Sequence, residues 1–179
     1  MRWEDSVLAM LDDLEMQADG LHLAERAAEV DALSVAGYAE VELVARLHGS
    51  IGADLRVGLA DGRDVRGRLV AVGLDWFLLQ DAPGTQWALH RPAVALVAGL
   101  GSRSVPADAR PLSARLTLRS VLRRLGDDGL TCALHLVGGR VLHGVPERVG
   151  ADFVELRPAE AATPVAVPVD SVAVVQGAG

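Results

Sequence analysis

Two histidines and two aspartates are the residues of this chain whose types and spacing could support metal binding or acid–base chemistry. His135 and His143 flank a Gly-Gly turn, where side chains can meet across adjacent strands, but a metal would need at least one further ligand and supporting contacts. Asp75 and Asp152 could serve as general acid and base. Each follows a glycine in a tight turn, however, where aspartate accepts local backbone hydrogen bonds. A structural role is therefore favoured for the two aspartates, and a solvated position on a strand is favoured for each histidine.

Other catalytic signatures are missing from the sequence. It contains neither a nucleophile-elbow serine nor a phosphate-binding glycine loop. Cys132 is the only cysteine, so neither an intrachain disulfide nor a cysteine-based zinc site can form. We therefore expect a protein that is not an enzyme, with no catalytic residue, no metal and no cofactor.

Arginine is the charged residue that could contact a polyanion. Arg115, Arg119 and Arg123 recur at four-residue spacing along one side of a predicted helix, and Arg63 and Arg140 occupy equivalent turns. These five arginines are the candidate contacts for RNA or for an acidic partner. The chain carries a net charge of -7, which would repel a long polyanion, and no aromatic platform for base stacking accompanies the arginines. Solvation, or docking against acidic helices of the same chain, is therefore favoured over RNA binding.

The elements that carry these residues come from a segment that occurs twice. Residues 57–79 match residues 134–156, and residues 87–99 match residues 165–177. Two copies of one unit indicate an architecture built by duplication. The repeated residues are mostly of turn and core types. Those we expect to shape the turns and bends are Gly62, Gly67, Gly73, Asp75, Gly139, Gly144, Gly150 and Asp152.

Each copy is predicted to be all-β. Leu55, Val57 and Leu59 alternate with polar or small residues, which is the two-residue period of a half-buried strand. Asp61-Gly62 and Gly138-Gly139 are hairpin signals. Further strands are expected over residues 65–72, 76–79, 87–89, 94–97, 153–156, 165–167 and 172–175. Five short, bent strands per copy fit a small closed barrel, which leaves no exposed sheet edge.

The first 47 residues are acidic and helical in pattern. They hold eleven acidic residues against three arginines, and Trp3, Val7, Leu11 and Leu14 follow helical spacing. Further helices are expected at about 21–33, 39–47 and 113–125. Trp3 is a candidate anchor for a partner.

Composition and the N-terminus bear on the origin of the chain and its location. All 17 basic residues are arginine, which indicates a GC-rich bacterial, and specifically actinobacterial, genome. The acidic start does not resemble a signal peptide, and no apolar run is long enough to span a membrane. A cytoplasmic location is therefore expected.

The pattern of a helix and five strands resembles the Sm/LSm-like superfamily. The resemblance rests on V-x-L-x-x-G-R, an interior glycine on the second strand and a terminal V-x-G, and it covers roughly residues 43–100 and 120–178. It implies small barrels whose edge strands pair with neighbouring barrels. The family's RNA pocket uses an Asp and an Asn in the loop after the second strand, but this chain contains no Asn. Ala98 and Gln176 stand where the family has an arginine, so the resemblance implies the scaffold without the uridine pocket.

These observations predict an α+β fold with two tandem Sm-like, five-stranded barrels, each preceded by a helix. The expected parts are an acidic helical arm over 1–40, a helix and barrel over 41–101, a linker over 102–112, and a second helix and barrel over 113–179. The predicted function is a non-catalytic adaptor or assembly module that binds a protein partner or itself through barrel edges and the acidic helices. The alternative is an RNA-binding regulator that uses the arginine-rich helix face.

Overall fold

The computed structural model describes residues 38–158 and 163–177. The chain divides into a unit over Met1–Val41 and a unit over Glu42–Gly179. In the described part of the first unit, the Val41 N–H donates to the Tyr38 carbonyl at 3.0 Å and closes a single turn. The predicted helices over residues 1–33, and Trp3 with them, lie outside the described residues.

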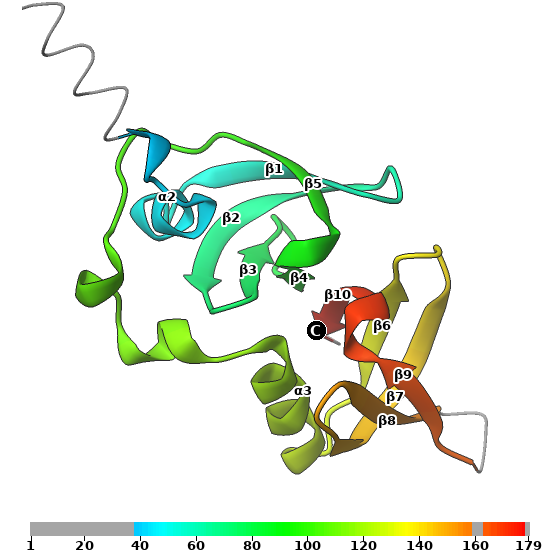
Figure 1. Ribbon diagram of the computed structural model, residues 1–179. Helices are drawn as coiled ribbons and strands as arrows, with labels where there is room; N and C mark the ends of the chain where they lie inside the picture. The colour runs from blue at the N-terminus through cyan, green and yellow to red at the C-terminus, as the bar shows by residue number, and fades with distance from the viewer. Residues whose placement is uncertain (1–37, 159–162, 178–179) are drawn as a thin grey trace, which may run out of the picture. The chain divides into compact units, whose positions relative to one another are not determined.

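The second unit is built mainly of β-strands (Figure 1). Its first half contains α2 (Leu43–Gly49), β1 (Asp54–Leu59), β2 (Asp64–Val72), β3 (Trp76–Gln80), β4 (Gln86–His90) and β5 (Val94–Ala98). Its second half contains α3 (Leu118–Asp127), β6 (Cys132–Leu136), β7 (Val141–Val149), β8 (Phe153–Pro158), β9 (Val165–Pro168) and β10 (Val172–Gly177). Short 3₁₀ helices are η1 (Arg91–Ala93), η2 (Ala107–Ala109), η3 (Leu112–Arg115) and η4 (Val169–Ser171).

The ten strands form one antiparallel sheet. Their spatial order is β5-β1-β2-β3-β4-β10-β6-β7-β8-β9. Within each half the last strand lies beside the first, and the other strands follow as hairpins. The strand order of the first half is thus repeated in the second, as the repeated sequence is.

The prediction of two tandem five-stranded barrels is wrong. Strand β4 of the first half pairs with β10 of the second, so the sheet is continuous through both halves and open at β5 and β9. Alternating apolar residues and turn glycines specify where strands begin and end. They do not specify which edges pair, because main-chain hydrogen bonds between edges require no particular side chain.

The hairpins are shaped by glycine at equivalent positions of the two halves. Gly62 joins β1 to β2 with φ of +87°, and Gly139 joins β6 to β7 with φ of +82°. These left-handed conformations are strained for any residue with a Cβ atom. Each of these glycines lies two residues before the strand that follows. The duplicated sequence is therefore folded into duplicated hairpins.

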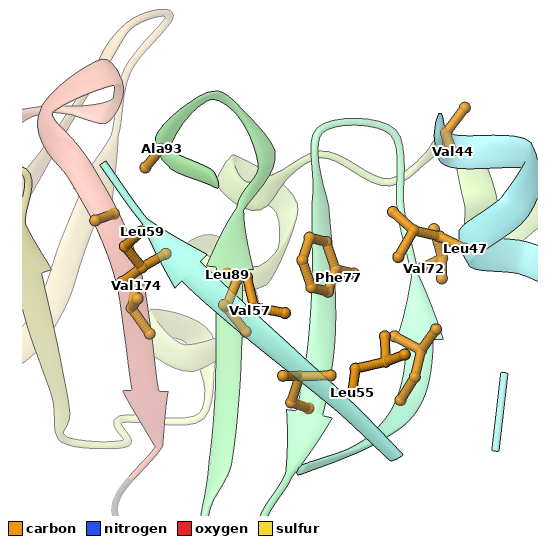
Figure 2. Packing of buried hydrophobic residues seen from close by; sticks show 13 residues of the cluster. Val44, Leu47, Leu55, Val57, Leu59, Val72, Phe77, Leu89, Ala93 and Val174 are labelled. Atoms are coloured by element: carbon orange, nitrogen blue, oxygen red, sulfur yellow. The ribbon is translucent and has the colours of Figure 1, made fainter. Parts of the chain in front are cut away.

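Two hydrophobic clusters form the core, and each draws on strands of both halves. The first, drawn in Figure 2, is built mainly on β1 to β4, yet it includes Val174 of β10 next to Leu59. The second is built on α3 and the second half, yet it includes Ala88 of β4. Leu59, Ala88 and Val174 are all at least 95% buried. The two halves are therefore packed together as well as hydrogen-bonded.

The helices differ from the predicted ones at their starts. The chain over Leu112–Arg115 forms η3, and α3 begins only at Leu118, where the Thr117 side chain accepts the Ser120 N–H as an N-cap. Pro111 precedes η3, and two extended residues, Leu116 and Thr117, separate η3 from α3, so residues that were predicted to share one helix lie on two elements. Helix α2 likewise begins at Leu43 rather than near residue 39.

The segment predicted as a linker over 102–112 packs against α2. The Val105 N–H donates to the Ala45 carbonyl at 3.0 Å, and the Arg46 guanidinium donates to the Gly101 carbonyl at 2.8 Å. His48 of α2 is buried, and its Nε2 atom has no hydrogen-bond partner among the residues that the structure describes. The connection between the halves is thus held to the first half.

Candidate functional site

The pairing of β4 with β10 is the most distinctive feature of the structure and brings polar side chains of both halves together. Its register places Val174 opposite Leu89, Val175 opposite Ala88 and Gln176 opposite Trp87. Polar clusters lie at both ends of this short ladder. We call the ladder and its two polar clusters the junction.

At the first end of the junction, Arg63 connects the two halves. Its Nη1 donates to His135 Nδ1 at 2.9 Å. A guanidinium cannot accept a hydrogen bond, so Nδ1 is the acceptor and the ring proton is on Nε2. That Nε2–H donates to Gln176 Oε1 at 3.0 Å. The network therefore requires the neutral form of His135.

Asp61 holds the Arg63 side chain in place. Its Oδ2 accepts from Arg63 Nε at 2.8 Å and from Arg63 Nη2 at 2.6 Å, a two-pronged pair. The Arg63 side-chain hydrogen bonds lower the pKa of Asp61 below its ordinary value of 3.8, although partial burial opposes this shift. The carboxylate therefore stays ionised in neutral solution and keeps the guanidinium directed at His135.

Trp87 forms a wall of the same end of the junction. Its ring centroid lies 5.8 Å from that of His135, with the planes tilted by 45°. Its Nε1–H donates to Asp81 Oδ2 at 3.1 Å, and Asp81 Oδ1 accepts the Thr85 N–H at 2.8 Å. The indole is thereby fixed by its own hairpin while its face meets the second half.

The second end of the junction is organised by His90 and Asp75. His90 is 3% exposed, and its Nδ1 donates to the Val172 carbonyl at 3.0 Å. Its Nε2 lies 4.0 Å from Asp75 Oδ2. Asp75 Oδ1 accepts the Leu118 N–H at 2.7 Å at the start of α3. The local turn bond predicted for the Asp75 side chain is thus replaced by a bond to a distant helix.

Asp75 and Asp152 remain equivalent in their backbones. The Asp75 carbonyl accepts the Arg91 N–H at 2.7 Å, and the Asp152 carbonyl accepts the Val169 N–H at 2.8 Å. Each bond ties the turn before the third strand of a half to the 3₁₀ turn after its fourth strand. Only Asp75 adds a carboxylate bond to α3, so its side-chain role belongs to the first copy alone.

A cavity of about 370 Å³ opens at the first end of the junction. Its lining includes Leu59, Val65 and Arg66 from the first half and His135 and Val174 from the second. A larger and shallower hollow of about 940 Å³ is lined by residues of β1 and β2, of the turn between β3 and β4, and of the end of β5. The smaller cavity is the one that combines an apolar floor with aromatic walls and charged groups.

The five predicted arginine contacts lie on several different elements. Arg115 lies on η3, whereas Arg119 and Arg123 lie on α3. Arg119 donates to the Ala151 carbonyl, so its guanidinium is used within the fold. Arg63 is held in the junction, and its repeat counterpart Arg140 is exposed at the other hairpin. The single helix face proposed for RNA is therefore divided between two elements.

The two histidines proposed as cross-strand neighbours do not oppose each other. In the β6–β7 register His143 lies opposite Ala133 and His135 lies opposite Val141. Over residues 38–158 and 163–177, no three His, Cys, Asp or Glu side chains are grouped as a metal site would require. Cys132 is buried, and desolvation raises the pKa of its thiol to about 11. The thiol therefore stays protonated at neutral pH.

The sequence reasoning missed Trp87, His90 and Gln176 as junction residues. A signal for them exists in the repeat itself. Their counterparts in the other copy are Val165, Pro168 and Ala98, and the counterpart of His135 is Gly58, as read from the matched segments. The junction is where the copies differ in hydrogen-bonding side chains. Divergence between copies, rather than identity, marks this site.

Comparison with known proteins adds no family to this picture. No model of a known protein family matches the chain, and a comparison with curated proteins found no match. In the described ranges, neither helix has the length and apolar character that crossing a membrane would require. The function must therefore be argued from the geometry of the sheet.

Proposed function

We propose that this chain is a non-catalytic assembly module that extends its sheet by pairing with a second copy of itself. In this proposal β9 of one copy pairs with β5 of the next. The observation that carries it is the β4–β10 junction, because β9 is the repeat counterpart of β4 and β5 is the repeat counterpart of β10. The kind of strand pairing that joins the two halves of one chain can therefore form a second time, between β9 of one chain and β5 of another.

The register of the proposed contact follows from the repeat. The matched segments place Leu96 at the position of Val174 and Val167 at the position of Leu89. Repeating the junction would therefore set Leu96 opposite Val167, and Ala98 opposite Val165. Pro168, which has no N–H, lies beyond the three residues that would pair, so it limits the ladder without blocking it.

Exposure of the edge residues supports the same contact. Leu96 is 51% exposed at the free edge, whereas its counterpart Val174 is 1% exposed in the junction. On the other edge Ala166 is exposed, whereas its counterpart Ala88 is 3% exposed. Both free edges thus present apolar side chains at positions that become buried when a neighbouring strand is present.

Such a contact joins two different edges and is therefore head-to-tail. A head-to-tail contact closes into a ring when the rotation between copies allows it, and otherwise continues as a filament. This proposal rests on strand pairing alone. The resemblance to Sm-like proteins and the role of the acidic helices remain predictions, and the divided arginines do not strengthen the RNA-binding alternative.

The test uses one charged substitution on each edge. We expect the full chain to form assemblies larger than one copy, and Leu96→Lys and Val165→Lys each to prevent growth because each removes one edge. Mixing the two variants should give a dimer and nothing larger, since each retains the edge that the other lacks. Sedimentation velocity over a range of concentrations measures all of these states.

The matched control is Val70→Lys. Val70 is 42% exposed, as Val165 is, but it lies on β2 within the sheet. This variant should assemble like the unmodified chain. A chain that stays monomeric at high concentration, or a mixture of the edge variants that stays monomeric, would overturn the proposal.

A further inference from the structure

We propose that the cavity at the first end of the junction is a binding site for small aromatic carboxylates. The inference does not depend on self-assembly, because every residue that lines the cavity belongs to one chain. Its volume of about 370 Å³ lies at the lower end of the range for small-molecule sites. The ligand class follows from the space, from the walls and from the one charged lining residue that has no partner in the described part of the chain.

The cavity lies where β2 extends beyond its pairing with β3. Strand β2 begins at Asp64, but its pairing with β3 begins only at Arg68. The start of β2 is paired with β1 but not with β3, and beside it the second half closes the cavity with His135 and Val174. The cavity is thus a consequence of the sheet topology and of the junction.

The floor and walls favour a flat apolar group. Leu59, Val65 and Val174 supply aliphatic surface, and Leu59 and Val174 are almost completely buried. The tilted rings of Trp87 and His135 border the same space. Aromatic groups pack favourably against such rings in offset or edge-to-face arrangements. An aromatic ligand therefore gains apolar and aromatic contact area here.

The charges favour a ligand with one negative group. Asp64 is paired with Arg56 at 2.6 Å, and Asp81 is hydrogen-bonded to the Trp87 indole. Arg63 is used by Asp61 and His135. In the described part of the chain, the Arg66 guanidinium has neither a hydrogen bond nor an ion pair, and Arg66 lines the cavity.

Arg66 lines an apolar cavity, and its guanidinium has no partner among the described residues, so it matches a carboxylate, which a guanidinium can bind through two parallel hydrogen bonds. The aromatic part of the ligand would then occupy the space between the floor and the two rings. Because the cavity is lined by both halves, an occupant binds the joined state and stabilises the junction against opening.

The experiment titrates the full-length protein with 2-naphthoate, with its neutral analogue 2-naphthamide, and with hexanoate, which has the charge but no ring. The readout is the indole N–H signal of Trp87 in ¹H–¹⁵N spectra, identified by its loss in Trp87→Phe. We expect 2-naphthoate to shift this signal, and to bind about tenfold more tightly than either analogue, which corresponds to about 1.4 kcal/mol.

Two arginine variants on one strand separate recognition from general charge. Arg66→Gln should weaken 2-naphthoate binding by about tenfold. Arg68→Gln should leave binding unchanged, since Arg68 is also exposed on β2 but lines only the larger hollow. Equal binding of the acid and the amide, an equal effect of the two variants, or no shift of the Trp87 signal at millimolar 2-naphthoate would overturn the proposal.

Discussion

Arg63 and His135, which are 72 positions apart in the sequence, are joined by a hydrogen bond of 2.9 Å between Nη1 and Nδ1. The bond links a turn of the first half to a strand of the second, with the imidazole Nδ1 as the acceptor. The repeat counterparts of these residues are Arg140 and Gly58, so the duplicated unit does not contain the pair. The contact is specific to the way the two copies are joined.

This contact predicts energetic coupling between the halves. Arg63→Ala and His135→Ala should each lower the free energy of unfolding, and the double variant should lose less than the sum of the two. Contacting residues of this kind show coupling of about 0.5–3 kcal/mol. Urea unfolding of the four proteins measures the coupling. Arg140→Ala is the control for removing a hairpin arginine, and it should show no coupling with His135→Ala.

Local structure was predictable because it depends on local patterns. The alternation of Leu55, Val57 and Leu59 specifies a strand with one buried face, and β1 extends over Asp54–Leu59. Gly62 and Gly139 lie in the two hairpin turns with positive φ. These features depend on neighbouring residues only, so the sequence suffices to locate them.

The junction was not predictable from the same patterns. Pairing of β4 with β10 is made by backbone groups, which every strand possesses. Its side-chain contacts join residues such as Asp75 and Leu118, which no local pattern relates. The helix predicted over 113–125 is present from Leu118 onward but was predicted to begin too early, because helical spacing of arginines does not reveal the two extended residues that separate η3 from α3.

His48 predicts a pH dependence of stability. Its pKa is held below the ordinary value of 6.5, first by burial and then by the positive charge of Arg110. The unfolded chain therefore takes up this proton at a higher pH than the folded chain does. Its contribution to stability is complete above pH 6.5 and is lost as the pH falls from 6.5 through the lowered folded value.

The comparison of the chain with His48→Gln isolates this effect, because glutamine does not titrate. The free energy of unfolding of the unmodified chain, relative to that of His48→Gln, should be constant above pH 6.5. Below pH 6.5 it should decrease. Urea unfolding between about pH 8 and pH 5 measures it. The exposed His143, changed to Gln, is the control for loss of an imidazole. A difference that does not vary with pH would contradict the assignment.

Gly67 and Gly144 predict a steric requirement at equivalent bends. A Cβ atom on Gly67 would lie 2.6 Å from the Gln80 carbonyl oxygen, and one on Gly144 would meet the Arg157 carbonyl in the same way. Alanine at either position must displace a strand, and overpacking of this kind costs about 1–3 kcal/mol.

Gly138→Ala is the matched control. A Cβ atom there meets nothing within 4 Å, and the backbone does not have positive φ. This variant should change the free energy of unfolding by less than about 0.5 kcal/mol. Thermal and urea unfolding of the three alanine variants distinguish them. Equal stability of Gly67→Ala and Gly138→Ala would show that the close approach of β2 and β3 is not a constraint.

Asp75 predicts that one carboxylate holds α3 to the first half. Asp75→Ala leaves the Leu118 N–H without its acceptor, and it removes the carboxylate beside buried His90. By analogy with removal of a helix cap, the cost should be about 0.5–2 kcal/mol. Asp152→Ala removes the exposed counterpart and should be nearly neutral. Urea unfolding gives the difference, and amide hydrogen exchange at Leu118 should accelerate only in Asp75→Ala. If both variants behaved alike, the bond between Asp75 and α3 would not contribute to holding the two halves together.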